Sequence, residues 1–129
     1  MIPLVDCSID ISCSKNPSED STKLEYAITN IFGNLDIQTS KYALKASSKS
    51  LETLTKIHES ITNHNTKQIY HRILNDNLSE NSTWFYINKQ AAFVNNVAVC
   101  EHEDESPLGP IKVILYSKNI QRIIEWLIS

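Results

Sequence analysis

A run of five residues from Glu101 to Glu105 contains four carboxylates and one imidazole. Such groups are ligands of divalent cations, so the run could hold the metal ion of a small hydrolase. Its spacing matches no known cation cage, because an EF-hand loop needs alternating acids, a central Gly and a distant Glu. A solvated acidic turn is therefore the favoured interpretation, and the metal-dependent hydrolase is kept as an alternative.

Other patterns that carry chemistry are missing from the sequence. The histidines show no HxxxH or HExxH pairing of the kind that binds zinc; they stand at His58, His64, His71 and His102. The 2 glycines, Gly33 and Gly109, are too few for the usual phosphate-binding loops, and no GxSxG motif is present. The sequence predicts a protein that is not an enzyme and that holds neither a metal nor a cofactor.

Cysteine usage indicates a reducing compartment. The chain has 3 cysteines, an odd number. Cys7 and Cys13 lie on one predicted strand, roughly 20 Å apart at about 3.3 Å per residue, which is too far for a disulfide. Cys100 ends an apolar run, where a core thiol is commoner than a nucleophile. With no apolar run long enough to span a membrane and no signal peptide, we expect a cytoplasmic protein.

Positive charge is concentrated in the middle of an acidic chain. The net charge is −3, but residues 41–72 carry six basic against two acidic side chains, giving +4, whereas residues 1–40 carry −4 and residues 73–129 carry −3. Such a region could neutralise RNA phosphates and make binding salt-dependent, provided that its side chains meet on one patch. The alternative is a set of ordinary solvated lysines. The six basic residues are Lys41, Lys45, Lys49, Lys56, Lys67 and Arg72.

The first 33 residues are predicted to form a strand followed by a helix. Apolar residues at odd positions over 5–13 predict a half-buried strand. Asn16 and Glu19, with a Pro between them, predict a helix start with a capping box. That helix is expected to end at Gly33, because glycine tolerates the backbone conformation of a helix C-terminus.

The middle of the chain combines a strand with two helices. A second strand over 35–47 changes the register of its apolar residues, which predicts a bulge at 39–41. A helix is predicted over 50–63. A second helix is predicted from Asn65, whose spacing to a Gln fits a capping box. The linker between the helices is short, which favours antiparallel neighbours.

The last third is rich in strands. Segments 83–89, 94–100 and 111–117 are predicted as strands, and Asn119 is predicted to cap a final helix with an apolar stripe. The order is β-α-β-α-α-β-β-β-α. We therefore predict one α+β domain over residues 1–129, with a single, mostly antiparallel sheet and helices packed on one face.

The predicted order α-β-β-β-α over 65–129 is also that of double-stranded-RNA-binding domains. Those domains present a lysine cluster at the start of their last helix to bind phosphates. Here Lys118 and Arg122 alone flank that helix start. Any contact with RNA is therefore expected to differ in detail from theirs.

Three strings give the sequence a recognisable signature: INKQAA at 87–92, ESPLGPI at 105–111 and IIEWL at 123–127. Together with the opening strand and the Pro-Ser-Glu-Asp helix start, they resemble the uncharacterised archaeal protein family UPF0201 over essentially the whole chain. The family's usual string has His before Lys-Gln-Ala-Ala, where this chain has Asn88. The resemblance implies a fold like that of the large-subunit ribosomal protein that binds 5S RNA and, by that analogy, a nucleic-acid-binding role.

The leading hypothesis is a non-catalytic cytoplasmic module that binds RNA through the basic region 41–72. Lys89 and Gln90 are expected to assist, because the loop from Pro107 to Pro110 is stiff and could present them beside it. The alternative is a structural or interaction protein that forms a homodimer. It would self-associate through a sheet edge or through the aromatic residues Trp84, Phe85 and Tyr86.

Overall fold

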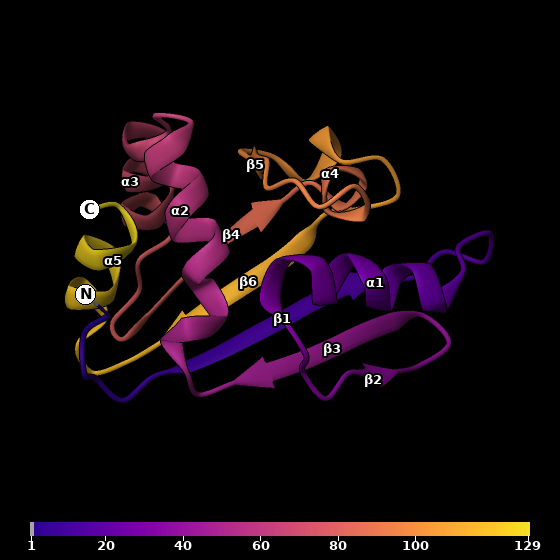
Figure 1. Ribbon diagram of the computed structural model, residues 1–129, viewed down its shortest axis with the longest axis horizontal. Coiled ribbons are helices and arrows are strands. Elements are labelled where there is room, and N and C mark those ends of the chain that lie inside the picture. The colour runs from indigo at the N-terminus through magenta and orange to yellow at the C-terminus, as the bar shows by residue number, and fades with distance from the viewer. Residues whose placement is uncertain (1) are drawn as a thin grey trace.

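The computed structural model describes residues 2–129, and it shows an antiparallel sheet with helices packed on one face (Figure 1). Within these residues six strands follow the order β2-β3-β1-β6-β4-β5. The predicted α+β class is therefore confirmed. The strands are β1 (Ser8–Ser14), β2 (Gln38–Thr39), β3 (Ala43–Ser48), β4 (Ser82–Ile87), β5 (Val99–Cys100) and β6 (Ile111–Tyr116). The helices are α1 (Ser21–Phe32), α2 (Thr55–Asn63), α3 (Lys67–Asp76), α4 (Lys89–Phe93) and α5 (Ile120–Leu127), with the 3₁₀ turns η1 (Leu51–Leu54) and η2 (Glu103–Glu105).

The sheet has one buried face and one open face, because successive side chains of a strand point to opposite sides. In β1, Ile9 and Ile11 are buried, whereas Asp10 and Ser12 are partly exposed. Figure 1 shows α1 and α2 lying across the strands on the buried side. The side chains on the opposite side form the surface that we call the open face: Asp10, Ser12, Lys45, Ser47, Trp84, Tyr86, Lys112 and Ile114.

Helix α1 begins later than the sequence predicts. Its N-cap is Asp20, whose carboxylate accepts a hydrogen bond from the backbone of Thr22 at 2.9 Å. The predicted contact between Asn16 and Glu19 does form, since Glu19 Oε1 accepts the Asn16 backbone N–H at 2.9 Å. This contact closes a turn that precedes the helix, and it does not cap the helix. The helix ends at Gly33 with a positive φ of 85°, as predicted.

The predicted bulge at 39–41 is wrong, because the chain reverses there. β2 and β3 pair as an antiparallel hairpin, with Gln38 opposite Lys45 and Thr39 opposite Leu44. Ser40 closes the turn by donating its backbone N–H to the Ala43 carbonyl at 2.8 Å. The change of apolar register marks two paired strands and not one bent strand.

The central helices are confirmed with one change at each start. The helix predicted over 50–63 is present, but it opens with η1, which Ser50 caps, before α2 begins. The predicted capping box at Asn65 is absent among the described contacts: Asn65 has a positive φ of 54°, and α3 starts at Lys67. Asn119 is the N-cap of α5, as predicted, although its side chain makes no capping hydrogen bond in the structure of residues 2–129.

Helix α4 is the largest departure from the predicted order. The strand β4 stops at Ile87, where Asn88 Oδ1 accepts the Ala91 backbone N–H at 2.9 Å and starts the helix. A helix N-cap needs a side chain that accepts a hydrogen bond from the first turn, and the amide oxygen of asparagine does so. The strand expected over 94–100 shrinks to β5. The order from residue 65 onward is therefore α-β-α-β-β-α, and the match to the order of double-stranded-RNA-binding domains is lost.

Across residues 2–129, none of the helices has the length and apolar character needed to cross a membrane.

Candidate nucleic-acid interface

The basic residues of the central region do not form one patch. Lys45 lies on the open face, and Lys49 follows the end of the same strand. Lys41 lies in the β2–β3 turn, where its Nζ is 5.4 Å from the centre of the Tyr42 ring. Lys67 is exposed at the start of α3 in the helical layer. The predicted surface common to all six is therefore not formed, because Lys45 lies on the open face and Lys67 lies in the helical layer on the other side of the sheet.

The remaining two members of the set are bound to neighbouring groups. Lys56 on α2 donates to the Asn30 carbonyl at 3.0 Å and also contacts the side chain of Asn95. Arg72 on α3 forms an ion pair with Glu101. These contacts hold the two cations beside α1 and the acidic loop, away from Lys45.

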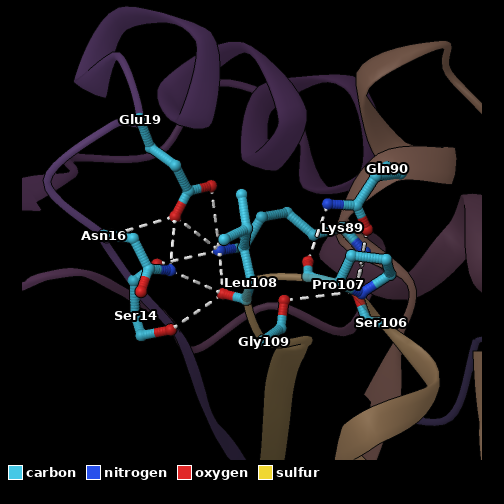
Figure 2. A network of polar contacts seen from close by, with 9 residues as sticks. All are labelled: Ser14, Asn16, Glu19, Lys89, Gln90, Ser106, Pro107, Leu108 and Gly109. Carbon is cyan, nitrogen blue, oxygen red and sulfur yellow. Dashed lines mark hydrogen bonds and ion pairs between the residues drawn. The ribbon is translucent and has the colours of Figure 1, made fainter.

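Lys89 is the clearest correction to the predicted interface, because its side chain is fully buried, at 0% exposure. Figure 2 shows its ammonium at the centre of a network that joins the end of β1, the turn before α1 and the loop 106–109. Nζ donates to the carbonyls of Ser14 and Leu108, both at 2.9 Å, and lies 3.2 Å from both carboxylate oxygens of Glu19. A lysine held in this way stabilises the fold and does not reach a ligand at the surface.

Gln90 is likewise occupied within the protein. Its Nε2 donates to the Pro107 carbonyl at 2.8 Å, and its Oε1 accepts from the buried hydroxyl of Ser106 at 3.0 Å (Figure 2). Ser106 Oγ in turn accepts the Lys89 backbone N–H at 3.1 Å. The strings NKQAA and SPLG, which the sequence shows as separate signatures, are thus two sides of one hydrogen-bonded joint. We call this joint, with Glu19 and Ser14, the Lys89 network.

The Lys89 network also changes the pKa of the Glu19 carboxyl group. Burial acts to raise the pKa of Glu19, but hydrogen bonds from the backbone and side chain of Asn16 and the contact with Lys89 outweigh it. The pKa therefore lies below its ordinary value of 4.5. The folded state thus favours the charged form of this carboxyl.

This direction predicts how stability depends on pH. A carboxyl whose pKa is lower in the folded than in the unfolded state adds stability above its unfolded pKa, and loses it as the pH falls through its folded pKa. We expect the melting temperature to fall on acidification below about pH 4.5, and to fall less steeply in the variant Glu19→Gln. Thermal unfolding followed by circular dichroism over this range measures both curves. Parallel curves would contradict the expectation.

The open face brings cations and aromatic rings together across the strands. Lys45 and Lys112 are both cross-strand partners of Ser12, and Tyr86 is the partner of Lys112 on its other side. Lys112 Nζ lies 4.5 Å from the centre of the Trp84 ring. The rings of Trp84 and Tyr86 meet edge to face at 5.0 Å. Such a surface offers both positive charge and π-faces to a ligand.

The linear sequence hides this arrangement for identifiable reasons. Lys45 is near other lysines in sequence, whereas its neighbour Lys112 is distant in sequence and adjacent through strand register. Phe85, predicted as part of an aromatic surface, is fully buried against Tyr70. The signal available was strand alternation, which puts Trp84 and Tyr86 on the side opposite to Phe85.

Two hollows are formed on the open face. One has a volume of about 360 Å³ and lies between Tyr42 and Tyr86, with Ser12, Lys45 and Lys112 also contributing to its walls. The other has a volume of about 340 Å³ and lies beside Lys45 toward Asp10 and Asp36. Glu103 contributes a carboxylate to the first hollow, so the surface has mixed charge.

The acidic loop and the cysteines were the other chemical candidates. Ligand atoms of Glu101, His102 and Glu105 lie within 4.8 Å of one another, but all three residues are exposed. Glu101 pairs with Arg72, and Glu105 accepts the Glu101 backbone N–H at 2.9 Å, as in a solvated turn. Burial, aided by Glu105, raises the pKa of Cys100 to about 11, which disfavours the reactive thiolate.

Comparison with known proteins adds a family and a fold. A family model described as RNA binding matches residues 8–116. A UPF0201 protein of Sulfurisphaera tokodaii is 39% identical over 123 residues, covering 92% of this chain and 85% of the relative. A UPF0201 protein of Methanothermobacter thermautotrophicus is 35% identical over 119 residues, covering 92% of this chain and 89% of the relative.

A solved structure has the same architecture. The crystal structure of a UPF0201 protein from Methanococcus jannaschii aligns with a TM-score of 0.80 and 26% identity, covering 95% of this chain and 99% of the other.

Proposed function

The chain belongs to the UPF0201 family, and from this membership we propose that it is a non-catalytic protein that binds RNA through the open face of its sheet. The observation that carries the proposal is the cross-strand grouping of Lys45, Lys112, Trp84 and Tyr86. It takes the place of the basic region 41–72 as the contact surface. The described helices pack on the other side of the sheet, so this face is accessible to a partner.

The chemistry of the open face suits RNA better than it suits a small substrate. Aromatic side chains on a sheet can stack with bases, and lysines beside them can neutralise phosphates. Each stacked base contributes about 1–3 kcal/mol to binding in proteins of this kind. The role is proposed as non-catalytic because the candidate groups are not activated: Lys89 is enclosed and burial raises the pKa values of Cys13 and Cys100.

We place the protein in the cytoplasm, where the thiols of Cys7, Cys13 and Cys100 would stay reduced, as they are in the structure. A fold likeness to the large-subunit ribosomal protein that binds 5S RNA stays a prediction. So does a homodimer, which light scattering over a range of protein concentrations would test.

The test of RNA binding is the double variant Lys45→Gln/Lys112→Gln. We expect it to bind a labelled single-stranded RNA at least about tenfold more weakly than the unmodified protein at low salt, because two cations beside the aromatic rings are lost. The slope of log affinity against log salt should also fall in magnitude, by about 0.7 for each phosphate contact removed. Fluorescence anisotropy at several salt concentrations measures both quantities.

Lys67→Gln is the control, since it removes one positive charge, half of that lost in the double variant, from an exposed lysine of the helical layer. It should leave the affinity within about twofold. If the chain binds no RNA at low salt, or if Lys67→Gln weakens binding as much as the double variant does, the open face is not the binding surface.

A further inference from the structure

The hollow between Tyr42 and Tyr86 is large enough to hold a single unpaired base. We propose that it binds a guanine base of single-stranded RNA, an inference that rests on the proposed RNA-binding function and names the ligand of one part of that surface. Its volume of about 360 Å³ lies at the small end of ligand pockets. A base inside a duplex is stacked and paired and cannot enter such a hollow, whereas an unpaired base can.

The aromatic side chains supply the stacking surface. Tyr42 is exposed to 66% and stands at the end of the β2–β3 turn, so its ring is available to a ligand. Tyr86 is partly exposed on β4, and its ring rests edge-on against Trp84 at 5.0 Å. Because each ring stands on a different part of the sheet, the hollow between them is formed by the fold and not by one flexible segment.

The charges in the hollow favour a base over a phosphate. Glu103 contributes a carboxylate, and the same carboxylate is close enough to Tyr86 to add to the effect of burial in raising the pKa of that phenol. A carboxylate repels phosphate and accepts hydrogen bonds. Lys45 and Lys112 also line the hollow, and their ammonium groups can act as hydrogen-bond donors. An uncharged ligand that presents donors and acceptors side by side satisfies both kinds of group.

Guanine is the base that fits this combination best. Its Watson–Crick edge has two adjacent N–H donors, at N1 and N2, next to the O6 acceptor. A carboxylate can accept from both donors with its two oxygens while an ammonium donates to O6. Adenine, cytosine and uracil each lack the pair of adjacent donors, so the carboxylate of Glu103 would be incompletely matched.

The test compares pentanucleotides of uridine in which the central base is G, A, C or U, together with a duplex of the same length. We expect the oligomer with G to bind at least about fivefold more tightly than the others, and the duplex to bind most weakly. Glu103→Gln should abolish the preference for G while leaving binding of the all-uridine oligomer no weaker. Tyr42→Ala should weaken every single-stranded oligomer by fivefold or more.

A matched control is Glu125→Gln, which removes an exposed carboxylate from α5 and should keep the preference for G. Quenching of Trp84 fluorescence gives a second readout, because its ring contacts Tyr86, whereas Trp126 is buried against His58. Equal affinity for the four oligomers, or a preference that survives Glu103→Gln, overturns the guanine site while RNA binding itself still stands. Absence of binding to every RNA overturns the proposed function as well.

Discussion

Replacing Lys89 by methionine is expected to lower the free energy of unfolding by about 3–5 kcal/mol. Methionine keeps the length and apolar stem of the side chain but removes the ammonium. The Glu19 carboxylate, whose side chain is 7% exposed, then stays buried without its ion-pair partner. The carbonyls of Ser14 and Leu108 each lose a hydrogen bond of 2.9 Å. The loss of stability arises mainly because the buried carboxylate and carbonyls are left without partners, and less because their attraction to the ammonium is lost.

Urea unfolding followed by circular dichroism measures this change. Lys67→Met is the control, because this exposed lysine should alter stability by no more than about 0.5 kcal/mol. Adding Glu19→Gln to Lys89→Met should recover part of the loss, since the remaining side chain is uncharged. A loss below about 1 kcal/mol for Lys89→Met, or no recovery in the double variant, would mean that the Lys89 network does not hold these segments together.

Replacing Gly109 by alanine should produce the second large loss of stability, about 1.5–4.5 kcal/mol in total. The residue has a φ of +92°, which alanine adopts at a cost of about 1–3 kcal/mol. A Cβ at this position would also lie 2.7 Å from Ser14 Oγ. The hydroxyl, at the end of an exposed side chain, must then move and give up its hydrogen bond to the Leu108 carbonyl, which adds about 0.5–1.5 kcal/mol.

A double-mutant cycle separates the two causes. Ser14→Ala removes the crowding atom, so the double variant Gly109→Ala/Ser14→Ala should be less destabilised than the sum of the single variants. The backbone strain at position 109 persists in both. Strict additivity in urea unfolding would show that the clash with Ser14 contributes nothing, and an unchanged stability in Gly109→Ala would show that the loop 106–109 adapts freely.

Sequence patterns predicted the long strands and helices better than the turns and short helices that connect them. The alternation of apolar and polar residues over 5–13 is a strong signal for a strand, and the apolar stripe of the last helix is a strong signal for a helix. Each pattern repeats with the period of its element. The turn at Ser40 and the short helix α4 were missed, since a few residues are too few for any periodicity. Asn88 carried a usable signal as a helix cap, but the aromatic and β-branched residues before it favoured continuing the strand.

The candidate site was less predictable because it depends on strand register. Lys45 and Lys112 meet through Ser12, and this pairing becomes visible once β1 is known to lie between β3 and β6. The burial of Lys89 was unpredictable for a similar reason, since its partners come from three separate segments. Charge counted along the chain therefore pointed to residues 41–72 and did not show the grouping of Lys45 with Lys112 on the open face.

The pairing of β1 with β6 also bears on how the protein is made. Residues 8–13 of β1 find their β6 partners at 111–116, and Ser117 Oγ donates to the Asp6 carbonyl across 111 positions. At a synthesis rate of about 5–20 residues per second, β1 is made roughly 5–20 s before those partners are made. The edge of β1 that pairs with β6 has no partner during that delay. The centre of the sheet must therefore assemble late in translation, and a chaperone that shields the nascent N-terminal segment would raise the yield of native protein.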